Sequence, residues 1–299
     1  MRTLVLAYSG MGHRCLEALL AAPEVEIVGV CSHRDDPEET VWSPSVAELA
    51  RRHQLPLHLS SHLDNEEGAR FARACRPELI LSIYYRALIP QPLLDLPTRG
   101  AFNMHGSLLP LYRGRAPINW ALLEGATETG VTLHEMVARA DAGAIVGQRR
   151  ISIDPADDAP SLTEKATVAA VELLGRQLPR LVAGELQLRP QRLGDGFYRG
   201  RRSPEDGRID WSWPAERVHN LVRALTQPWP GAFCYSGDRK LTIWQSEPLG
   251  SGESGRAGAL SVGRQPSVLC GEGSLRLLRW ELEGEKADNP AFLKDLQLR

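Results

Sequence analysis

Two polar side chains, Asn103 and His105, stand two positions apart at the end of the apolar segment 100–105. In an extended strand, side chains at alternate positions leave the same face, so this amide and this imidazole should converge on one reacting centre. An amide N–H can stabilise negative charge that develops on a carbonyl oxygen, and an imidazole can donate or accept a proton. The pair therefore suits acyl transfer to an amine, in which charge collects on oxygen while protons move between two nitrogens.

A third group must set the charge of the imidazole, and Asp141, in the small-residue segment 140–143, is the candidate. A carboxylate within a few ångströms of His105 would favour the imidazolium form and raise the pKa of the histidine. Two plainer interpretations stay open at this point. An Asn-x-His pair at a strand end is more often a satisfied loop pair than a catalytic one, and Asp141 alone could equally cap a helix or a turn.

Arginines lie close to the candidate pair, at Arg113 and Arg115. On a loop shaped by glycine and proline they suit an anionic ligand better than a solvated surface. A second basic run is typical of linker surface, with contact to a phosphate as the alternative: Arg199, Arg201 and Arg202. No cluster of histidine, cysteine and carboxylate residues has the spacing of metal ligands, so we expect no metal site.

Length and composition bound the kind of protein. The chain has 299 residues, a formal net charge of −2 at pH 7 and five widely spaced cysteines. The length favours two domains, and the balanced charge gives no reason to expect nucleic acid as a partner. The unpaired cysteine pattern, the absence of a signal-like N-terminus and the absence of a long apolar run predict a cytoplasmic protein that is not inserted into a membrane. The sequence allows a homo-oligomer without specifying one.

The elements that must position the candidate residues follow from the apolar pattern. Apolar runs at 3–8, 25–31, 77–85 and 100–105 predict buried strands, and amphipathic stretches between them predict helices. This alternation predicts an α/β domain with a Rossmann-like parallel sheet flanked by helices. Ligands bind beyond the carboxyl ends of strands in such sheets, which is where the candidate pair lies. Gly10-x-Gly12 is only a fragment of the dinucleotide fingerprint, so a tight turn is favoured there over a nucleotide site.

The second half of the chain contains further expected strands, helices and a linker. Strands are expected at 130–136 and 147–153, and a long helix at 161–181 that begins with a Ser161-x-x-Glu164 capping box. A polar, glycine-rich and arginine-rich segment at 194–207 reads as a linker. After a short helix at 215–225, several short apolar segments predict a small β-barrel or sandwich. We therefore expect a catalytic domain over residues 1–195 and a smaller domain, with the linker, over residues 196–299.

Several motifs together resemble the 10-formyltetrahydrofolate-dependent formyltransferases: Asn103-x-His105-x-Ser107-Leu108-Leu109-Pro110, Tyr112-Arg113-Gly114, Ala116-Pro117, Thr129-Gly130-Val131-Thr132 and Asp141-x-Gly143. The resemblance runs through the first domain and continues in the second. Within the family, the pattern is similar to the enzymes that formylate the 4-amine of UDP-4-amino-4-deoxy-L-arabinose in lipid A modification and polymyxin resistance.

The resemblance implies a formyltransferase fold with a C-terminal OB-like β-barrel. It makes His105 the proton donor, Asn103 the group that stabilises the transition state and Asp141 the group that raises the pKa of the histidine. It implies 10-formyltetrahydrofolate as co-substrate, bound by Ala87, Leu88, Ile89, Arg115, Val137, Ala138, Arg139, Ala140 and Asp141. It implies a UDP-aminosugar as acceptor, bound by Tyr85, Ser107, Arg201 and Arg202.

Two other functions are compatible with parts of this pattern. Methionyl-tRNA formyltransferases share the core motif and the barrel, although the near-neutral second domain argues against a grip on an acceptor stem. A folate-binding or nucleotide-binding protein without catalysis would need neither Asn103 nor His105 for its function. The sequence leaves the identity of the aminosugar open, and it leaves open whether the chain acts alone or beside a dehydrogenase domain.

Overall fold

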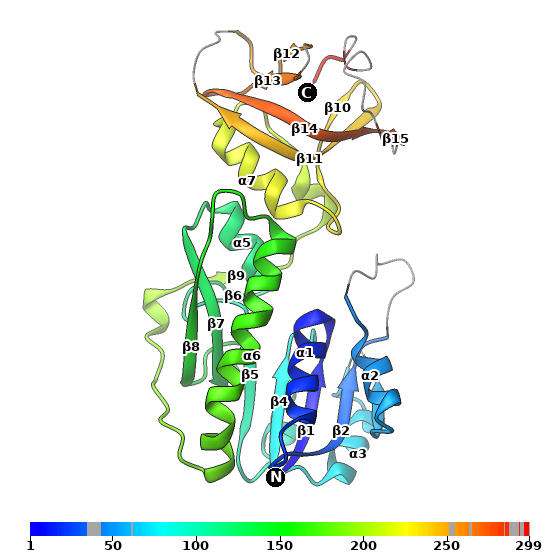
Figure 1. The fold of residues 1–299 in the computed structure, drawn as a ribbon, viewed down its shortest axis with the longest axis vertical. Helices are drawn as coiled ribbons and strands as arrows, with labels where there is room; N and C mark the ends of the chain where they lie inside the picture. The colour runs from blue at the N-terminus through cyan, green and yellow to red at the C-terminus, as the bar shows by residue number, and fades with distance from the viewer. Residues whose placement is uncertain are drawn as a thin grey trace. The chain divides into compact units, whose positions relative to one another are not determined.

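A computed structural model describes residues 1–34, 43–60, 62–250, 255–262, 265–283, 285–286, 293 and 296–298. Contacts within the chain define two units, coloured by chain position in Figure 1. The first unit comprises Met1–Pro117, Glu128–Ser152 and Glu164–Arg199. The second comprises Ile118–Thr127, Ile153–Thr163 and Gly200–Arg299.

The first unit is built on a seven-stranded sheet in the order β3-β2-β1-β4-β5-β7-β8. Its strands are β1 (Arg2–Ala7), β2 (Glu26–Ser32), β3 (Leu57–Leu59), β4 (Leu79–Ile83), β5 (Ala101–His105), β7 (Glu128–Glu135) and β8 (Ile145–Ser152). The first five strands of this order are parallel, as the sequence predicts. β7 runs antiparallel to β5 and to β8, so the sheet is mixed.

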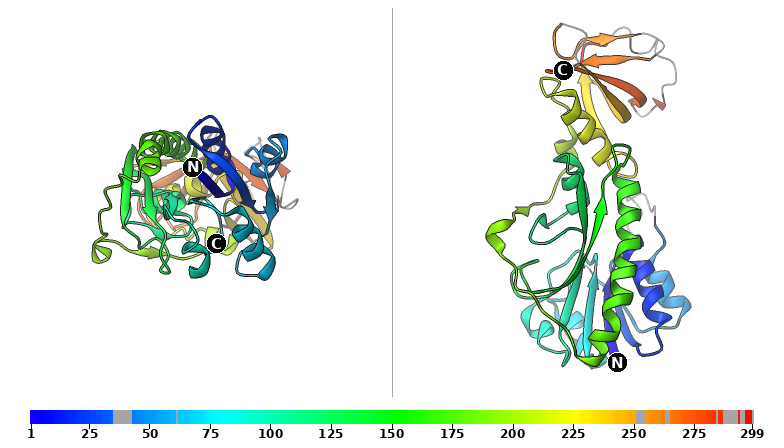
Figure 2. Two further views of the ribbon diagram at one scale, coloured as in Figure 1. Left: turned by 90° about the horizontal axis from the view of Figure 1, so that it is seen from below. Right: turned by 60° about the vertical axis from the view of Figure 1, so that its left-hand side comes forward.

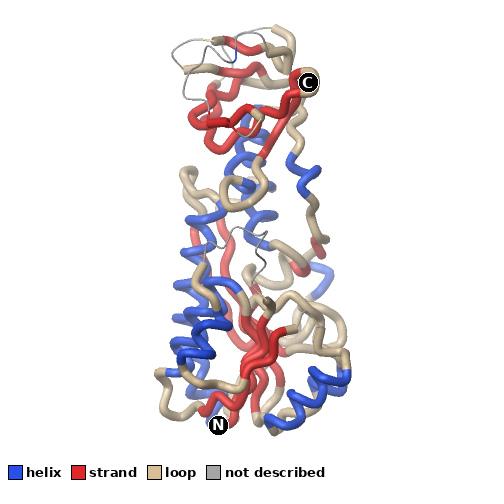
Figure 3. The backbone as a smooth tube through the Cα atoms, turned by 90° about the vertical axis from the view of Figure 1, so that its right-hand side faces the viewer, coloured by secondary structure: helices blue, strands red, loops and turns tan. Residues whose placement is uncertain are grey.

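Helices cover both faces of this sheet, as the two views in Figure 2 show. The helices of this unit are α1 (Ser9–Leu20), α2 (Val46–Arg52), α3 (Glu66–Cys75), α4 (Gln91–Leu94) and most of α6 (Ala159–Ala183), whereas α5 (Pro117–Leu123) belongs to the second unit except for its first residue. α1, α2 and α6 lie on one face, and α3 and α4 on the other, with the strands between them in Figure 3. Leu4 and Leu6 of β1 face the α3 side, while Val5 and Ala7 between them are also buried. A strand buried on both faces explains the continuous apolar runs.

The start of α6 differs from its sequence prediction. The helix begins at Ala159, two residues before the expected start. Asp158 is the capping residue: its carboxylate accepts a hydrogen bond from the Ser161 N–H at 2.9 Å, and its own N–H donates to the Ser161 hydroxyl at 3.0 Å. The capping box is therefore Asp158 with Ser161 rather than Ser161 with Glu164.

The second unit contains a smaller antiparallel sheet with the strand order β10-β11-β14-β13-β12, and β15 pairs with β14. Its elements are α7 (Ala215–Leu225), β10 (Ala232–Ser236), β11 (Arg239–Leu249), β12 (Leu260–Ser261), β13 (Ser267–Leu269), β14 (Ser274–Leu282) and β15 (Glu285–Lys286). Val218, Leu221 and Val222 of α7 share a buried cluster with Leu241 and Leu275 of the sheet. The register shifts within β11 after Ile243, an irregularity that favours a curved sheet. The unit is a small barrel-like domain.

A short segment of the first unit runs back toward the main sheet after α6. It contains the 3-10 helix η1 (Leu193–Asp195) and strand β9 (Tyr198–Arg199), which pairs in parallel with β6 (Arg113–Gly114). A second 3-10 helix, η2 (Pro204–Gly207), follows in the second unit. Among the described helices, none is long and apolar enough to cross a membrane.

Candidate active site

The end of β5 carries the candidate pair between two neighbouring strands. Asn103 lies opposite Ser82 of β4 on one side and opposite His134 of β7 on the other. Phe102 and Met104, the residues that alternate with the pair, are buried in the apolar interior. The alternation of the strand therefore separates the polar pair from the core, as its spacing predicts.

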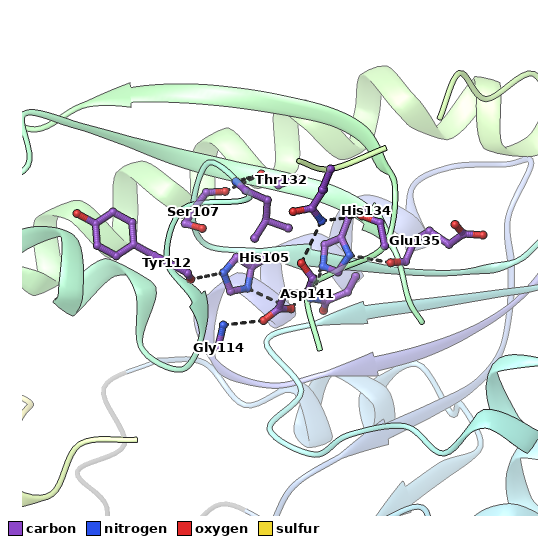
Figure 4. Close-up of polar contacts among 12 residues, drawn as sticks. His105, Ser107, Tyr112, Gly114, Thr132, His134, Glu135 and Asp141 are labelled. Atoms are coloured by element: carbon purple, nitrogen blue, oxygen red, sulfur yellow. Dashed lines mark hydrogen bonds and ion pairs between the residues drawn. The ribbon is translucent and has the colours of Figure 1, made fainter. Parts of the chain in front are cut away.

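Asp141 joins the pair from the loop that follows β7 (Figure 4). One carboxylate oxygen, Oδ2, accepts a hydrogen bond from the Gly114 N–H at 2.8 Å. The other, Oδ1, lies 3.6 Å from His105 Nδ1 and 3.5 Å from His134 Nε2. The structure thus brings Asn103, His105 and Asp141 into one cluster, a proximity that their separation in the sequence could not show.

The loop reaches this position through an unusual backbone. Asp141 itself has φ of 53°, in the left-handed region that aspartate tolerates better than most residues. A Cβ on Gly143 would lie 2.0 Å from the Glu135 carbonyl oxygen, so only glycine fits there. The small residues of the segment 140–143 are therefore required by a close backbone approach.

The imidazole of His105 is buried, and its two nitrogens have different partners. Nε2 lies 2.9 Å from the Tyr112 carbonyl oxygen, which can only accept, so Nε2 carries a proton. Nδ1 lies 3.6 Å from the Asp141 carboxylate, longer than a normal N–H···O hydrogen bond. Nδ1 therefore faces the carboxylate as an ion-pair partner when the ring is charged, without a hydrogen bond of normal length.

Burial has the largest effect on His105 and places its pKa below the ordinary histidine value. The charge of Asp141 raises this pKa, His134 lowers it and the contact with the Tyr112 carbonyl raises it. The Asp141 effect thus has the expected direction, and desolvation of the charged imidazole outweighs it. At neutral pH the resting imidazole is uncharged.

Asp141 shows the opposite balance. Burial alone would raise the pKa of Asp141, but the neighbouring His105 and His134 side chains and the Gly114 N–H lower it well below the ordinary aspartate range. The carboxylate is therefore ionised at any pH at which the protein would work, and it is placed to stabilise a charged His105.

His134 orients the amide of Asn103. Its Nδ1 lies 2.8 Å from the Glu135 carbonyl oxygen, which can only accept, so Nδ1 carries a proton. Its Nε2 lies 3.1 Å from Asn103 Nδ2 and 3.5 Å from Asp141 Oδ1, and in the tautomer with the proton on Nδ1 alone it accepts a hydrogen bond from Asn103. This contact fixes which end of the amide is the nitrogen, and it leaves the second N–H of that nitrogen available to an oxyanion.

Ser107, an expected acceptor-binding residue, holds the loop that follows β5. Its hydroxyl is buried and donates to the Leu111 carbonyl oxygen at 2.6 Å. Its own carbonyl accepts from the Thr132 hydroxyl at 2.6 Å, and the same hydroxyl accepts from the Leu109 N–H at 3.1 Å. The structure gives Ser107 and Thr132 a role in the shape of this loop.

The expected folate-binding residues lie on two exposed loops of the first unit. Ala87 and Ile89 after β4, and Met136 after β7, pack against the same buried cluster. Leu88 is 74% exposed and Val137 is 39% exposed, so apolar side chains face outward from this surface. The Arg115 side chain donates to the Arg86 carbonyl oxygen at 3.2 Å and ties a third loop to the first. The other expected residues of this set continue the second loop: Ala138, Arg139 and Ala140.

The remaining expected acceptor-binding residues have different surroundings. Tyr85 is buried, stacks on His33 with ring centroids 4.4 Å apart, and donates its hydroxyl to the Ser60 carbonyl oxygen at 2.8 Å. Arg201 and Arg202 belong to the second unit. Arg202 donates to the Asp206 carbonyl oxygen at 2.8 Å, and Arg201 is exposed.

Two features of the site were missed by sequence reasoning. The sequence pattern gives His134 no role, although its place in the strand expected at 130–136 offered a signal. The backbone groups of Tyr112 and Gly114, which bind His105 and Asp141, leave no signature in side-chain type. Among the described residues, no group of three or more histidine, cysteine, aspartate or glutamate side chains could hold a metal ion.

Comparisons with solved structures identify proteins of similar fold. One is the N-formyltransferase from Helicobacter canadensis in complex with folinic acid and dTDP-3-aminofucose, with 16% identity, a TM-score of 0.69, and coverage of 96% of this chain and 100% of that one. Another is WlaRD, a sugar 3N-formyltransferase solved with dTDP and 5-N-formyl-THF, with 16% identity, a TM-score of 0.71, and coverage of 97% and 98%. A sugar N-formyltransferase from Shewanella sp. FDAARGOS_354 has 20% identity, a TM-score of 0.66, and coverage of 81% and 96%.

The sequence also matches two family models. Residues 1–178 match the model described as formyl transferase, and residues 201–295 match the formyl transferase C-terminal domain. The first match alone spans more than half of the chain and contains the whole cluster of Asn103, His105 and Asp141. The chain belongs to the formyl transferase family and is a formyl-transferring enzyme.

Proposed function

We propose that this enzyme transfers the formyl group of 10-formyltetrahydrofolate to the amine of a nucleotide-linked aminosugar, with UDP-4-amino-4-deoxy-L-arabinose as the acceptor. The observation that carries the proposal is the convergence of Asn103, His105 and Asp141 at the end of β5. Two proteins of similar fold were solved with a folate derivative together with dTDP or a dTDP-aminosugar, which supports this class of substrates. The motifs shared with the UDP-4-amino-4-deoxy-L-arabinose formyltransferases support the choice of sugar.

Each member of the cluster has a role in this reaction. Attack of the amine on the formyl carbon places negative charge on the formyl oxygen, and the free N–H of the Asn103 amide donates to that oxygen. The uncharged His105 takes the amine proton and becomes an imidazolium. Asp141, ionised and 3.6 Å away, stabilises that cation until it returns the proton to the departing folate nitrogen. No proton is gained or lost over the cycle.

The surface beside the cluster fits a folate. Its outward-facing apolar side chains, Leu88 and Val137, can pack against a flat aromatic ring. The loops that carry them end next to the catalytic cluster, because Asp141 itself belongs to the second loop. We propose that Ala87, Leu88 and Ile89, together with Arg115 and residues 137–141, bind the formyl donor.

The phosphates of the acceptor are assigned to two arginines of the second unit. A nucleotide diphosphate carries negative charge that arginine recognises well. The exposed Arg201 and the half-buried Arg202, whose guanidinium lies 5.0 Å from the centre of the Trp120 ring, are the proposed phosphate contacts. Tyr85 and Ser107 stay in the proposed acceptor set, although both hydroxyls already donate to backbone carbonyls.

An acceptor panel tests the proposed function. The enzyme is incubated with 10-formyltetrahydrofolate and, in parallel, with UDP-4-amino-4-deoxy-L-arabinose, dTDP-3-aminofucose and charged initiator tRNA, and the products are identified by mass spectrometry. We expect formylation of the UDP-aminosugar. Formylation of dTDP-3-aminofucose alone would contradict the UDP-arabinose assignment and keep the class of substrate, whereas formylation of tRNA alone would overturn the proposal. Folate binding without any transfer would indicate a binding protein.

A further inference from the structure

One segment of the first unit contacts two loops of the catalytic site. One loop carries Asp141, and the other carries the Tyr112 and Gly114 backbone groups that bind His105 and Asp141. This return segment comprises residues 189–199, which follow α6 and include η1 and β9. At its start, Arg189 and Ile145 exchange backbone hydrogen bonds of 2.8 and 2.9 Å. Between them and the catalytic cluster, the Gln191 side chain donates to the Asp141 carbonyl oxygen at 3.0 Å and to the Gly143 carbonyl oxygen at 2.6 Å.

The end of the return segment holds the other loop. The Arg113 N–H donates to the Phe197 carbonyl oxygen at 3.1 Å, and the Arg115 N–H donates to that of Arg199 at 3.0 Å. The Phe197 ring packs edge-on against Tyr112, with centroids 4.8 Å apart. These contacts fix the stretch of backbone whose Tyr112 carbonyl binds His105 and whose Gly114 N–H binds Asp141.

Gln191 occupies the point where this support reaches the catalytic carboxylate. Both of its partners are carbonyl oxygens, which can only accept, so the amide nitrogen must face them. It spans Asp141, whose backbone is left-handed, and Gly143, whose close approach to Glu135 excludes any side chain. A backbone in such a sparsely populated conformation persists only where its surroundings hold it. The amide of Gln191 supplies two of the hydrogen bonds that do so.

We propose that Gln191 is a positioning residue for formyl transfer, acting through the loop 141–143 to keep the Asp141 carboxylate beside His105. Gln191 touches neither substrate in this account. If it is lost, the carboxylate moves away from His105 and a charged imidazole is less well stabilised. The groups that then still face His105 are His134, which disfavours its charge, and the Tyr112 carbonyl.

The test replaces Gln191 by methionine, which keeps the size of the side chain and removes its donors, and by asparagine, whose amide is one methylene too short. Arg192→Met is the matched control, because Arg192 is the exposed neighbour in the same segment. Thermal melting verifies that each variant is folded, and the polar asparagine variant carries the test if the methionine variant does not fold. Formyl transfer is then measured with 10-formyltetrahydrofolate and UDP-4-amino-4-deoxy-L-arabinose, an assay that rests on the proposed function.

We expect kcat to fall about 10–100-fold in both Gln191 variants, with KM for either substrate nearly unchanged, because misplacement of a catalytic group by about 1 Å has effects of that size. A second readout needs no substrate: NMR titration of His105 in the free enzyme should show a lower pKa in the Gln191 variants than in the wild type and in Arg192→Met. Failure of the proposed substrate would leave this NMR result intact, so the two proposals fail separately. An unchanged His105 titration in folded Gln191 variants, or an equal change in Arg192→Met, would overturn the positioning role.

Discussion

At the level of single residues, the site combines a carboxylate that stays charged with a histidine that is uncharged at rest. Asp141 is ionised because two histidines and a backbone N–H surround it, and His105 is neutral because burial disfavours its charge. This difference lets His105 take up a proton and then release it, while Asp141 never changes state. The same pair with a fully solvated histidine would start the reaction already protonated at mildly acidic pH.

Removal of either the Asn103 or the His105 side chain should greatly slow turnover, whereas folate binding should survive. We expect Asn103→Ala to lower kcat about 10²–10³-fold, because it removes a donor to the oxyanion. We expect His105→Ala to lower it about 10²–10⁴-fold, because it removes the group that moves the proton. Folate affinity, measured by calorimetry, should change little in both variants.

His53→Ala is the control for these substitutions, since His53 is exposed at the end of α2. Its turnover should equal that of the wild type. Near-normal turnover in both Asn103→Ala and His105→Ala would show that the cluster is not catalytic.

At the level of elements, the loop after β5 depends on one hydroxyl from β7. The buried Thr132 hydroxyl donates to Ser107 and accepts from Leu109 and from the Gln148 side chain. Thr132→Val keeps the shape of the side chain but leaves these buried groups unpaired, which should cost about 1–3 kcal/mol in free energy of unfolding. Chemical denaturation measures this, with the exposed Thr127→Val as the control. Equal stability of the two variants would contradict the role given to Thr132.

Helix α7 carries a half-buried histidine, His219, with a consequence for stability. The pKa of His219 falls from 6.5 to about 4, mainly because of burial and secondly because of the charge of Arg223. Between these two values the His219 side chain binds a proton in the unfolded chain but not in the folded one. The free energy of unfolding should therefore decrease as the pH falls from 6.5 toward about 4. His219→Gln, which can still hydrogen-bond to Ser246, should show a weaker decrease.

Urea denaturation at several pH values measures this effect. Tryptophan fluorescence follows the second unit, which holds most of the tryptophans. His53→Gln serves as the control. If wild type and His219→Gln lose stability in parallel over this pH range, His219 is not the cause of the loss.

Most elements could be predicted from the sequence because their physical causes are local. The runs at 77–85 and 100–105 are apolar enough for strands buried on both faces, and β4 and β5 lie within them. The approach of Asp141 to His105 could not be predicted, because it depends on the antiparallel pairing of β7 with β5 and on a left-handed turn. The lowered pKa of His105 could not be predicted for a related reason: the sequence shows the charge of a neighbour but not the depth of burial.

At the level of the whole molecule, each unit has its own core, and the catalytic cluster and the proposed folate surface lie entirely within the first. The proposed phosphate contacts Arg201 and Arg202 belong to the second unit. The proposed boundary near residue 195 falls within the return segment, whose contacts with the catalytic loops assign it physically to the first unit.

Arg201 offers a direct test of the proposed phosphate contacts. Its side chain is exposed, so Arg201→Gln should leave the fold intact. We expect KM for the UDP-aminosugar to rise about tenfold, the effect of losing roughly 1.4 kcal/mol of charge-assisted binding, while KM for the folate is unchanged. Arg256→Gln, another exposed arginine of the second unit, is the control. An equal effect of both substitutions would point to general electrostatics instead of a contact at Arg201.

The central claim, that Asn103, His105 and Asp141 transfer a formyl group to a nucleotide-linked amine, is tested most directly by following the formyl carbon itself. Wild type and His105→Ala are each mixed in excess with 10-formyltetrahydrofolate labelled at the formyl carbon and with UDP-4-amino-4-deoxy-L-arabinose, in a single turnover. We expect the label to appear on the sugar amine with wild type, in step with release of tetrahydrofolate, and to stay on the folate with His105→Ala. Label that stays on the folate with wild type, or that reaches the sugar equally fast with His105→Ala, would contradict the claim.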